Sequence, residues 1–191
     1  MPACASRSSA RLALAAALAW ATAAAPARAN DPAPAPPGLR EAVAGALVRP
    51  QGPRFAAYRW PREPEIVALY YGADWCAPCH AFVPELRAVH DALRAAGADT
   101  EVVYVSLDAS EREMHRYMAR QAMPWPAIDH RRVERMPGLR ALGGMAPPNL
   151  VLLDRDGTVL ASGWAGRRYE GLAPVLRAWV ERAGAQAVPP P

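Results

Sequence analysis

Two closely spaced cysteines dominate the chemistry that this sequence could perform. Of the three cysteines, Cys4 lies near the N-terminus, whereas Cys76 and Cys79 are separated by two residues in the segment WCAPCH. Placed at the start of a helix, such thiols lie one turn apart, and the positive end of the helix dipole lowers the pKa of the first and makes it nucleophilic. We therefore expect an exposed Cys76 to attack substrate disulfides and Cys79 to resolve the mixed disulfide.

Other uses of this cysteine pair remain open at this point. A purely structural disulfide would stabilise little, because so small a loop hardly restrains the unfolded chain. A zinc site would need two further ligands, and the chain has no second cysteine pair to supply them. Together with His80, the pair also satisfies the C-x-x-C-H pattern of c-type haem attachment, which would make an electron-transfer module. A dithiol metallochaperone for Cu(I), a soft ion, is a further alternative.

The pair is expected to lie where a buried strand meets a helix. The apolar run 66–71 (IVALYY) is typical of a strand that is covered on both faces. After the pair, apolar residues recur at helical spacing until Gly97 ends the helix. These residues are Phe82, Leu86, Val89 and Leu93.

The remaining elements complete an alternating pattern. Residues 102–107 and 150–153 predict two more strands, and a turn at 154–157 leads into a fourth at 158–162. Helices are expected over 110–121, with capping-box spacing at its start, and around 172–180. The segment 122–148 is interpreted as an irregular connection with one short helix. The pattern predicts an α/β domain with a central mixed sheet flanked by helices.

The N-terminal region has the features of an export signal. Arg7 and Arg11 precede an apolar stretch, and Ala27-Arg28-Ala29 has the form of a cleavage site. We predict a signal peptide over 1–29 that is cleaved after Ala29, and hence a periplasmic or otherwise extracytoplasmic location. An uncleaved membrane anchor is the alternative. A proline-rich linker (30–38), one domain (39–185) and a disordered tail (186–191) are expected to follow.

Composition excludes several classes of protein. Hydrophobic residues make up 52% of the chain and charged residues 21%, which excludes disorder over most of its length. The formal charge is +4, but three of the 22 basic residues lie within 1–29, and the other 19 face 18 acidic residues. Because no block of like charge remains, nucleic acid and anionic membranes are not predicted as partners.

The region 66–163 resembles the thioredoxin superfamily, and within it the tryparedoxin and nucleoredoxin branch. A tryptophan directly precedes the first cysteine, and a proline follows the second by five residues, inside the predicted helix. A further proline lies where the family has its cis-proline, six residues before Asp154. The matching residues are Trp75, Cys76, Cys79, Pro84, Met123-Pro124-Trp125 and Pro148.

The resemblance implies a thioredoxin-like fold and a thiol–disulfide oxidoreductase that needs no metal or organic cofactor. It implies catalysis by Cys76 and Cys79, and protein or small-molecule disulfides and dithiols as substrates. A separate redox protein, including a membrane-embedded one, would recharge the enzyme, which is expected to be a monomer. The resemblance does not decide between reduction and oxidation. The substrate groove would be lined by Trp75, Ala77, Pro78, Pro147 and Pro148.

This sequence departs from the family pattern in two places. Tyr70 stands six residues before the nucleophile, where many thioredoxins have a buried aspartate, so that proton-transfer role is not carried over. Asp74 would disfavour a neighbouring thiolate and a protonated His80 would favour it, unless both are solvated surface residues.

The second departure is Pro147. In this family the backbone N–H and C=O of that residue pair with the substrate, but proline has no N–H. We expect Pro147→Thr to tighten a trapped mixed disulfide, and Pro147 itself is the alternative cis residue.

Overall fold

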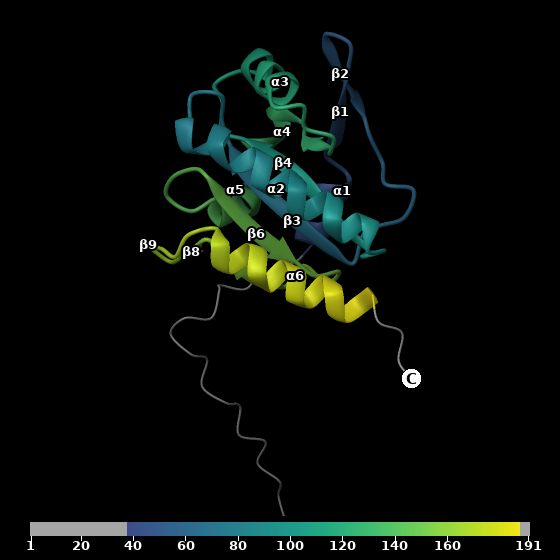
Figure 1. The fold of residues 1–191 in the computed structure, drawn as a ribbon. Helices are drawn as coiled ribbons and strands as arrows, with labels where there is room; N and C mark the ends of the chain where they lie inside the picture. The colour runs from purple at the N-terminus through teal and green to yellow at the C-terminus, as the bar shows by residue number, and fades with distance from the viewer. Residues whose placement is uncertain (1–37, 188–191) are drawn as a thin grey trace, which may run out of the picture.

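The computed structural model describes residues 38–187, which fold around one mixed sheet of seven strands (Figure 1). The predicted signal peptide, all of the predicted linker except Gly38, and residues 188–191 of the predicted tail lie outside the described residues. Among the described helices, none is both long and apolar enough to cross a membrane.

The centre of the sheet is β3 (Ile66–Gly72), whose seven residues are all buried. It pairs in parallel with β4 (Thr100–Ser106) and antiparallel with β6 (Asn149–Leu153). A turn over 154–157 then leads into β7 (Val159–Ser162), which pairs antiparallel with β6. These four strands confirm the strands predicted from the apolar runs.

Beyond β4, the sheet continues through strands that the sequence did not predict. β4 pairs in parallel with β5 (Ala127–Ile128), β5 pairs antiparallel with β1 (Leu47–Gln51), and β1 forms a hairpin with β2 (Arg54–Ala57). β1 contains Pro50, which argues against a central strand. It is tolerated because β5 pairs with β1 only at Leu47 and Val48, so no partner on that side needs its missing N–H.

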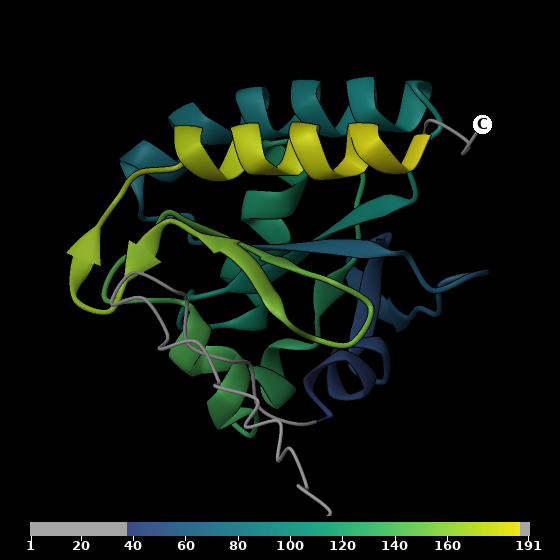
Figure 2. The same ribbon diagram turned by 90° about the horizontal axis from the view of Figure 1, so that it is seen from below.

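One face of the sheet is covered by α2 (Ala77–Ala95), α3 (Glu111–Arg120) and α6 (Ala173–Ala187). Figure 2 shows α2 and α6 side by side above the strands. The predicted caps are present, since the Ser110 side chain accepts from the backbone of Glu113 and α2 ends two residues before Gly97. α6 runs two residues past the predicted domain end at 185.

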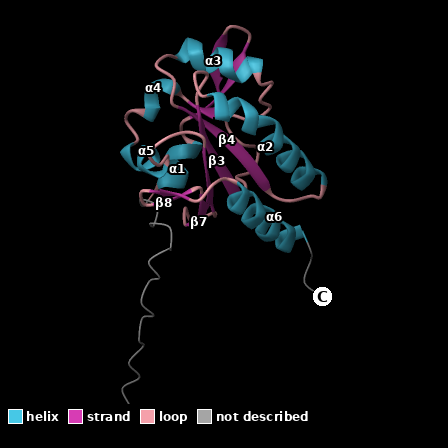
Figure 3. Cartoon of the chain, turned by 60° about the vertical axis from the view of Figure 1, so that its left-hand side comes forward, coloured by secondary structure: helices cyan, strands magenta, loops and turns pink. Residues whose placement is uncertain are grey.

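The opposite face is covered by three short helices, α1 (Leu39–Ala44), α4 (His130–Val133) and α5 (Pro137–Leu142). Figure 3 shows them across the strands from α2 and α6. The prediction of a single short helix in 122–148 is therefore wrong, because this segment contains β5, α4 and α5. Its elements are too short to produce a clear hydrophobic period. Finally, β8 (Trp164–Ala165) and β9 (Arg168–Tyr169) form a separate small hairpin.

Candidate functional site

The cysteine pair lies at the β3–α2 junction. β3 ends at Gly72, and Cys76 is the residue that caps the N-terminus of α2. The Cys76 sulfur accepts a hydrogen bond from the backbone N–H of Cys79 at 3.2 Å. The Cys76 carbonyl accepts from the backbone of Cys79 and His80. The sulfur of Cys76 therefore takes the place at the helix N-terminus where negative charge is stabilised.

The two sulfurs are joined in a disulfide, with the Cα atoms 5.2 Å apart. The exposed fraction of Cys76 is 4%, and that of Cys79 is zero. The expectation of a freely exposed nucleophile is therefore wrong for the disulfide form, because Cys76 packs with Cys79 in the buried cluster on this face of the sheet. Of the two cysteines, only Cys76 has any exposed area.

Trp75 directly precedes Cys76, and the Pro147–Pro148 segment directly precedes β6. Trp75 is 66% exposed. The Pro147–Pro148 peptide bond is cis, which assigns the expected cis-proline to Pro148. Because Tyr71 of β3 pairs with Asn149 of β6, the end of β3 and the residues before β6 meet at one edge of the sheet. The chain fold thus brings together residues that are about seventy positions apart. Ala77 and Pro78 form the first turn of α2.

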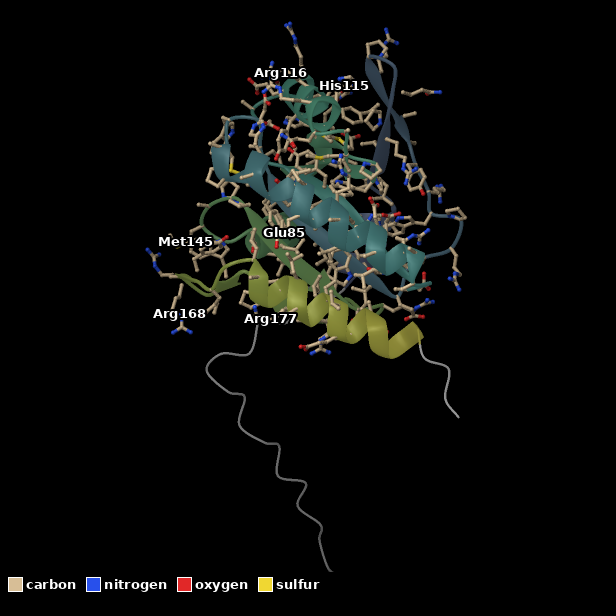
Figure 4. All side chains as sticks on the ribbon, in the orientation of Figure 1. Glu85, His115, Arg116, Met145, Arg168 and Arg177 are labelled. Atoms are coloured by element: carbon tan, nitrogen blue, oxygen red, sulfur yellow. A yellow bond between two sulfur atoms is a disulfide. The ribbon has the colours of Figure 1, made fainter. Side chains whose placement is uncertain are left out.

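The β8–β9 hairpin holds the segment around the cis-proline, which the sequence analysis did not foresee. Trp164 donates its indole N–H to the carbonyl of Ala146 at 3.2 Å, and the Tyr169 hydroxyl donates to the carbonyl of Pro148 at 3.3 Å. Their rings also contact each other across the hairpin, with centroids 5.0 Å apart. Arg168 of the hairpin and Met145 project from the same side of the molecule (Figure 4).

Tyr70, which stands at the position of the absent aspartate, has hydrogen-bond partners in Tyr117 of α3 and in the backbone of Cys79. The Tyr70 and Tyr117 hydroxyls lie 2.8 Å apart, and the Tyr70 hydroxyl is 3.4 Å from the carbonyl of Cys79. Burial raises the pKa of Tyr117 to about 12 and raises the pKa of Tyr70 well above its ordinary value. Both phenols are therefore neutral at physiological pH, so they offer hydrogen bonds rather than charge.

A buried carboxylate, Asp108, lies at the end of β4. Its Oδ1 accepts from the backbone N–H of Asp74 at 2.8 Å, and its Oδ2 accepts from the Ser106 and Tyr104 hydroxyls at 2.9 and 3.1 Å. The Tyr104 hydroxyl is also 3.1 Å from the carbonyl of Gly72. Asp108 therefore ties the segment before the cysteines to the neighbouring strand. Its position after a strand gave no sign of this role.

Asp74 and His80 are not the solvated surface residues considered above. The Asp74 side chain is only 8% exposed and contacts Arg116 and Arg120 of α3. His80 Nε2 lies 2.7 Å from the carbonyl of Asp74, and its Nδ1 lies 2.7 Å from the Gln121 amide nitrogen. Both ring nitrogens of His80 thus have protein partners.

These contacts also bear on the alternative uses of the cysteine pair. A haem iron would need a nitrogen of His80, and haem attachment would need both sulfurs, which are joined to each other. Across residues 38–187, no cluster of three histidine, cysteine or acidic side chains is arranged to hold a metal ion. The arrangement instead suits reversible opening and closing of the disulfide.

Comparison with known proteins places this chain in a family. A family model described as thioredoxin-like matches residues 64–159. Mouse nucleoredoxin is 32% identical over 128 residues, which cover 65% of this chain and 28% of that protein. The chain therefore spans little more than a quarter of this relative's length.

Two solved structures support the same assignment of the fold. Tryparedoxin I from Leishmania major superposes with a TM-score of 0.55 at 21% identity, covering 75% of this chain and 94% of that one. Tryparedoxin II from C. fasciculata gives a TM-score of 0.51 at 27% identity, covering 63% and 81%.

Proposed function

The chain belongs to the thioredoxin-like family, and we propose that it is a thiol–disulfide oxidoreductase that uses Cys76 as nucleophile and Cys79 as resolving thiol. The observation that carries this proposal is the difference between the two sulfurs. Cys76 caps the helix N-terminus and retains some exposure, whereas Cys79 is fully buried one turn later. We therefore expect an external sulfur to react with Cys76, and the Cys79 sulfur to attack Cys76 from inside the protein.

The reaction follows from this geometry as two exchanges. The Cys76 thiolate attacks one sulfur of a substrate disulfide, forms a mixed disulfide and releases the first substrate thiolate. The Cys79 thiolate then attacks the Cys76 sulfur, closes the internal disulfide and releases the second substrate thiolate. Two electrons pass to the substrate, which takes up two protons, and two cysteine thiols become one disulfide. The same steps in reverse oxidise a dithiol.

The chain's own residues assist these steps through charge and shape. The backbone N–H of Cys79 and the N-terminus of α2 stabilise negative charge on the Cys76 sulfur. The exposed ring of Trp75, together with Pro147 and Pro148, would contact the substrate beside the disulfide. Substrates would be protein or small-molecule disulfides.

The enzyme would be recharged by a separate redox protein, because the sequence has no nucleotide-binding signature. If the chain is exported through residues 1–29, its redox partner would also act outside the cytoplasm and could be embedded in a membrane. Mass determination of the chain after cell fractionation tests export and cleavage. An N-terminus at Asn30 in an extracytoplasmic fraction supports them, and an intact chain in the cytoplasm contradicts them.

The activity is tested by dithiothreitol-driven reduction of insulin. The wild-type chain should accelerate insulin precipitation, and both Cys76→Ser and Cys79→Ser should abolish turnover. Cys79→Ser should still form a mixed disulfide with insulin, whereas Cys76→Ser should not. Turnover that survives Cys76→Ser would contradict the proposal.

A further inference from the structure

Two arginines of α3 bind the acidic residue that precedes the reactive cysteine by two positions. Arg116 places Nε and Nη2 each 2.7 Å from Oδ2 of Asp74, and Arg120 places Nη1 3.0 Å from Oδ1. Arg116 extends from the outer part of α3 (Figure 4). Each oxygen of the Asp74 carboxylate therefore has its own cation, and the carboxylate is buried while the arginine side chains are 48% and 55% exposed.

The backbone of Asp74 is fixed as well as its side chain. Its N–H donates to Asp108 Oδ1 at 2.8 Å, and its carbonyl lies 2.7 Å from His80 Nε2. These two contacts fix the backbone that leads into Cys76, whereas the two arginines hold the carboxylate itself. Because Asp74 and Cys76 are two residues apart, their Cα atoms can be no more than about 7 Å apart, a distance over which charges interact.

A bare carboxylate at this position would disfavour the thiolate of Cys76. Together, Asp74, Arg116 and Arg120 carry one negative and two positive charges. The other ionisable groups around them are His80 on α2, Glu113 and Tyr117 on α3, and Asp108 after β4. Burial keeps the Tyr117 phenol neutral by raising its pKa to about 12.

We propose that Arg116 and Arg120 are positioning residues that neutralise Asp74 and so keep the Cys76 thiolate available for attack. This inference rests on the proposed function, in which Cys76 is the nucleophile. It assigns a role in the redox reaction to α3, which carries neither cysteine. The arginines act through Asp74 rather than by touching the substrate.

The test is the rate at which iodoacetamide alkylates Cys76 in the reduced Cys79→Ser chain at a fixed pH below neutrality. The double substitution Arg116→Gln and Arg120→Gln should slow alkylation about fivefold, the size expected when nearby cations are removed from a partly solvated thiolate. Arg112→Gln removes a cation from the same helix and should leave the rate within about twofold.

A charge cycle separates this role from a merely structural one. Asp74→Asn alone should not slow alkylation, and adding it to the double glutamine variant should restore part of the lost rate, because it removes the carboxylate that the arginines had neutralised. Replacing both arginines with lysine should restore most of the rate. An unchanged rate in the double glutamine variant, no recovery when Asp74→Asn is added to it, or a fall caused by Asp74→Asn alone would each overturn the inference.

Insulin reduction by chains that retain both cysteines distinguishes failure of the inference about Arg116 and Arg120 from failure of the proposed function. If only the inference fails, the wild-type chain and the double glutamine variant reduce insulin equally well. If the proposed function fails, neither chain accelerates the reaction, whatever the alkylation rates are.

Discussion

Replacing Asp108 should reveal how the buried carboxylate holds the segment before the cysteines. Asp108→Ala removes the acceptor for the backbone N–H of Asp74 and for two hydroxyls. The Tyr104 hydroxyl keeps the carbonyl of Gly72 at 3.1 Å, and the Ser106 hydroxyl can reorient toward neighbouring polar groups. The group left without a replacement is the N–H of Asp74.

The size of the effect follows from this single orphaned donor. A buried donor that loses its acceptor costs about 1–3 kcal/mol, and the lost bonds to a charged acceptor add to this. We expect Asp108→Ala to lower the free energy of unfolding by about 2–4 kcal/mol. Asp108→Asn should cost about 1 kcal/mol, because its amide oxygen can take the Asp74 N–H while its NH₂ group donates to the rotatable hydroxyls.

Urea unfolding of the oxidised chain measures both free energies. Asp156→Ala, in the exposed β6–β7 turn, is a control expected to change stability by no more than about 0.5 kcal/mol. Equal losses for Asp108→Ala and Asp108→Asn would refute the reasoning, because they would show that the orphaned N–H contributes nothing.

Three further outcomes are expected. Pro147→Thr should lengthen the lifetime of a mixed disulfide trapped on the Cys79→Ser chain about two- to tenfold, by restoring one backbone donor worth 0.5–1.5 kcal/mol; an unchanged lifetime contradicts this. Trp164→Phe should lower kcat/KM for insulin reduction about twofold, because the hydrogen bond to the carbonyl of Ala146 is lost. Trp60→Phe is the control, since the indole nitrogen of Trp60 has no partner among the described residues, and it should leave kcat/KM unchanged. Equal effects of the two substitutions would contradict a role of Trp164 in holding the cis-proline segment. Because the pKa of Tyr117 is raised to about 12, its contribution to the free energy of unfolding is complete below about pH 10 and is lost as the pH rises toward 12. An alkaline titration followed by phenolate absorbance should show Tyr117 ionising at higher pH than an exposed tyrosine. Ionisation at the ordinary pH would contradict its burial.

Local patterns predicted the elements that surround the cysteines. The run 66–71 is apolar throughout because β3 is buried on both faces, and the spacing from Phe82 to Leu93 matches the buried face of α2. The N-terminal hairpin escaped prediction because β1 contains Pro50 and β2 is only half-buried, so neither shows a strand pattern. Strand pairing with β5 depends on tertiary contacts that no local segment encodes.

The same limit applies to the site. The spacing of Cys76 and Cys79, together with their place between a strand and a helix, favoured a redox pair, although the spacing alone left haem attachment and metal binding open. Arg116 lies 42 residues from Asp74, so the ion pair leaves no local pattern. The burial of Cys76 could not be predicted either, because it depends on closure of the disulfide onto a sulfur that faces the core.

In the proposed reaction, Cys76 is the sulfur that reacts with an external disulfide. The most direct measurement is mass spectrometry of the reduced Cys79→Ser and Cys76→Ser chains after brief exposure to glutathione disulfide. We expect a glutathione adduct on Cys76 in the first chain and, in the second, an adduct on Cys79 that forms at least about tenfold more slowly. Equal rates in the two chains, or faster reaction at Cys79, would contradict this expectation.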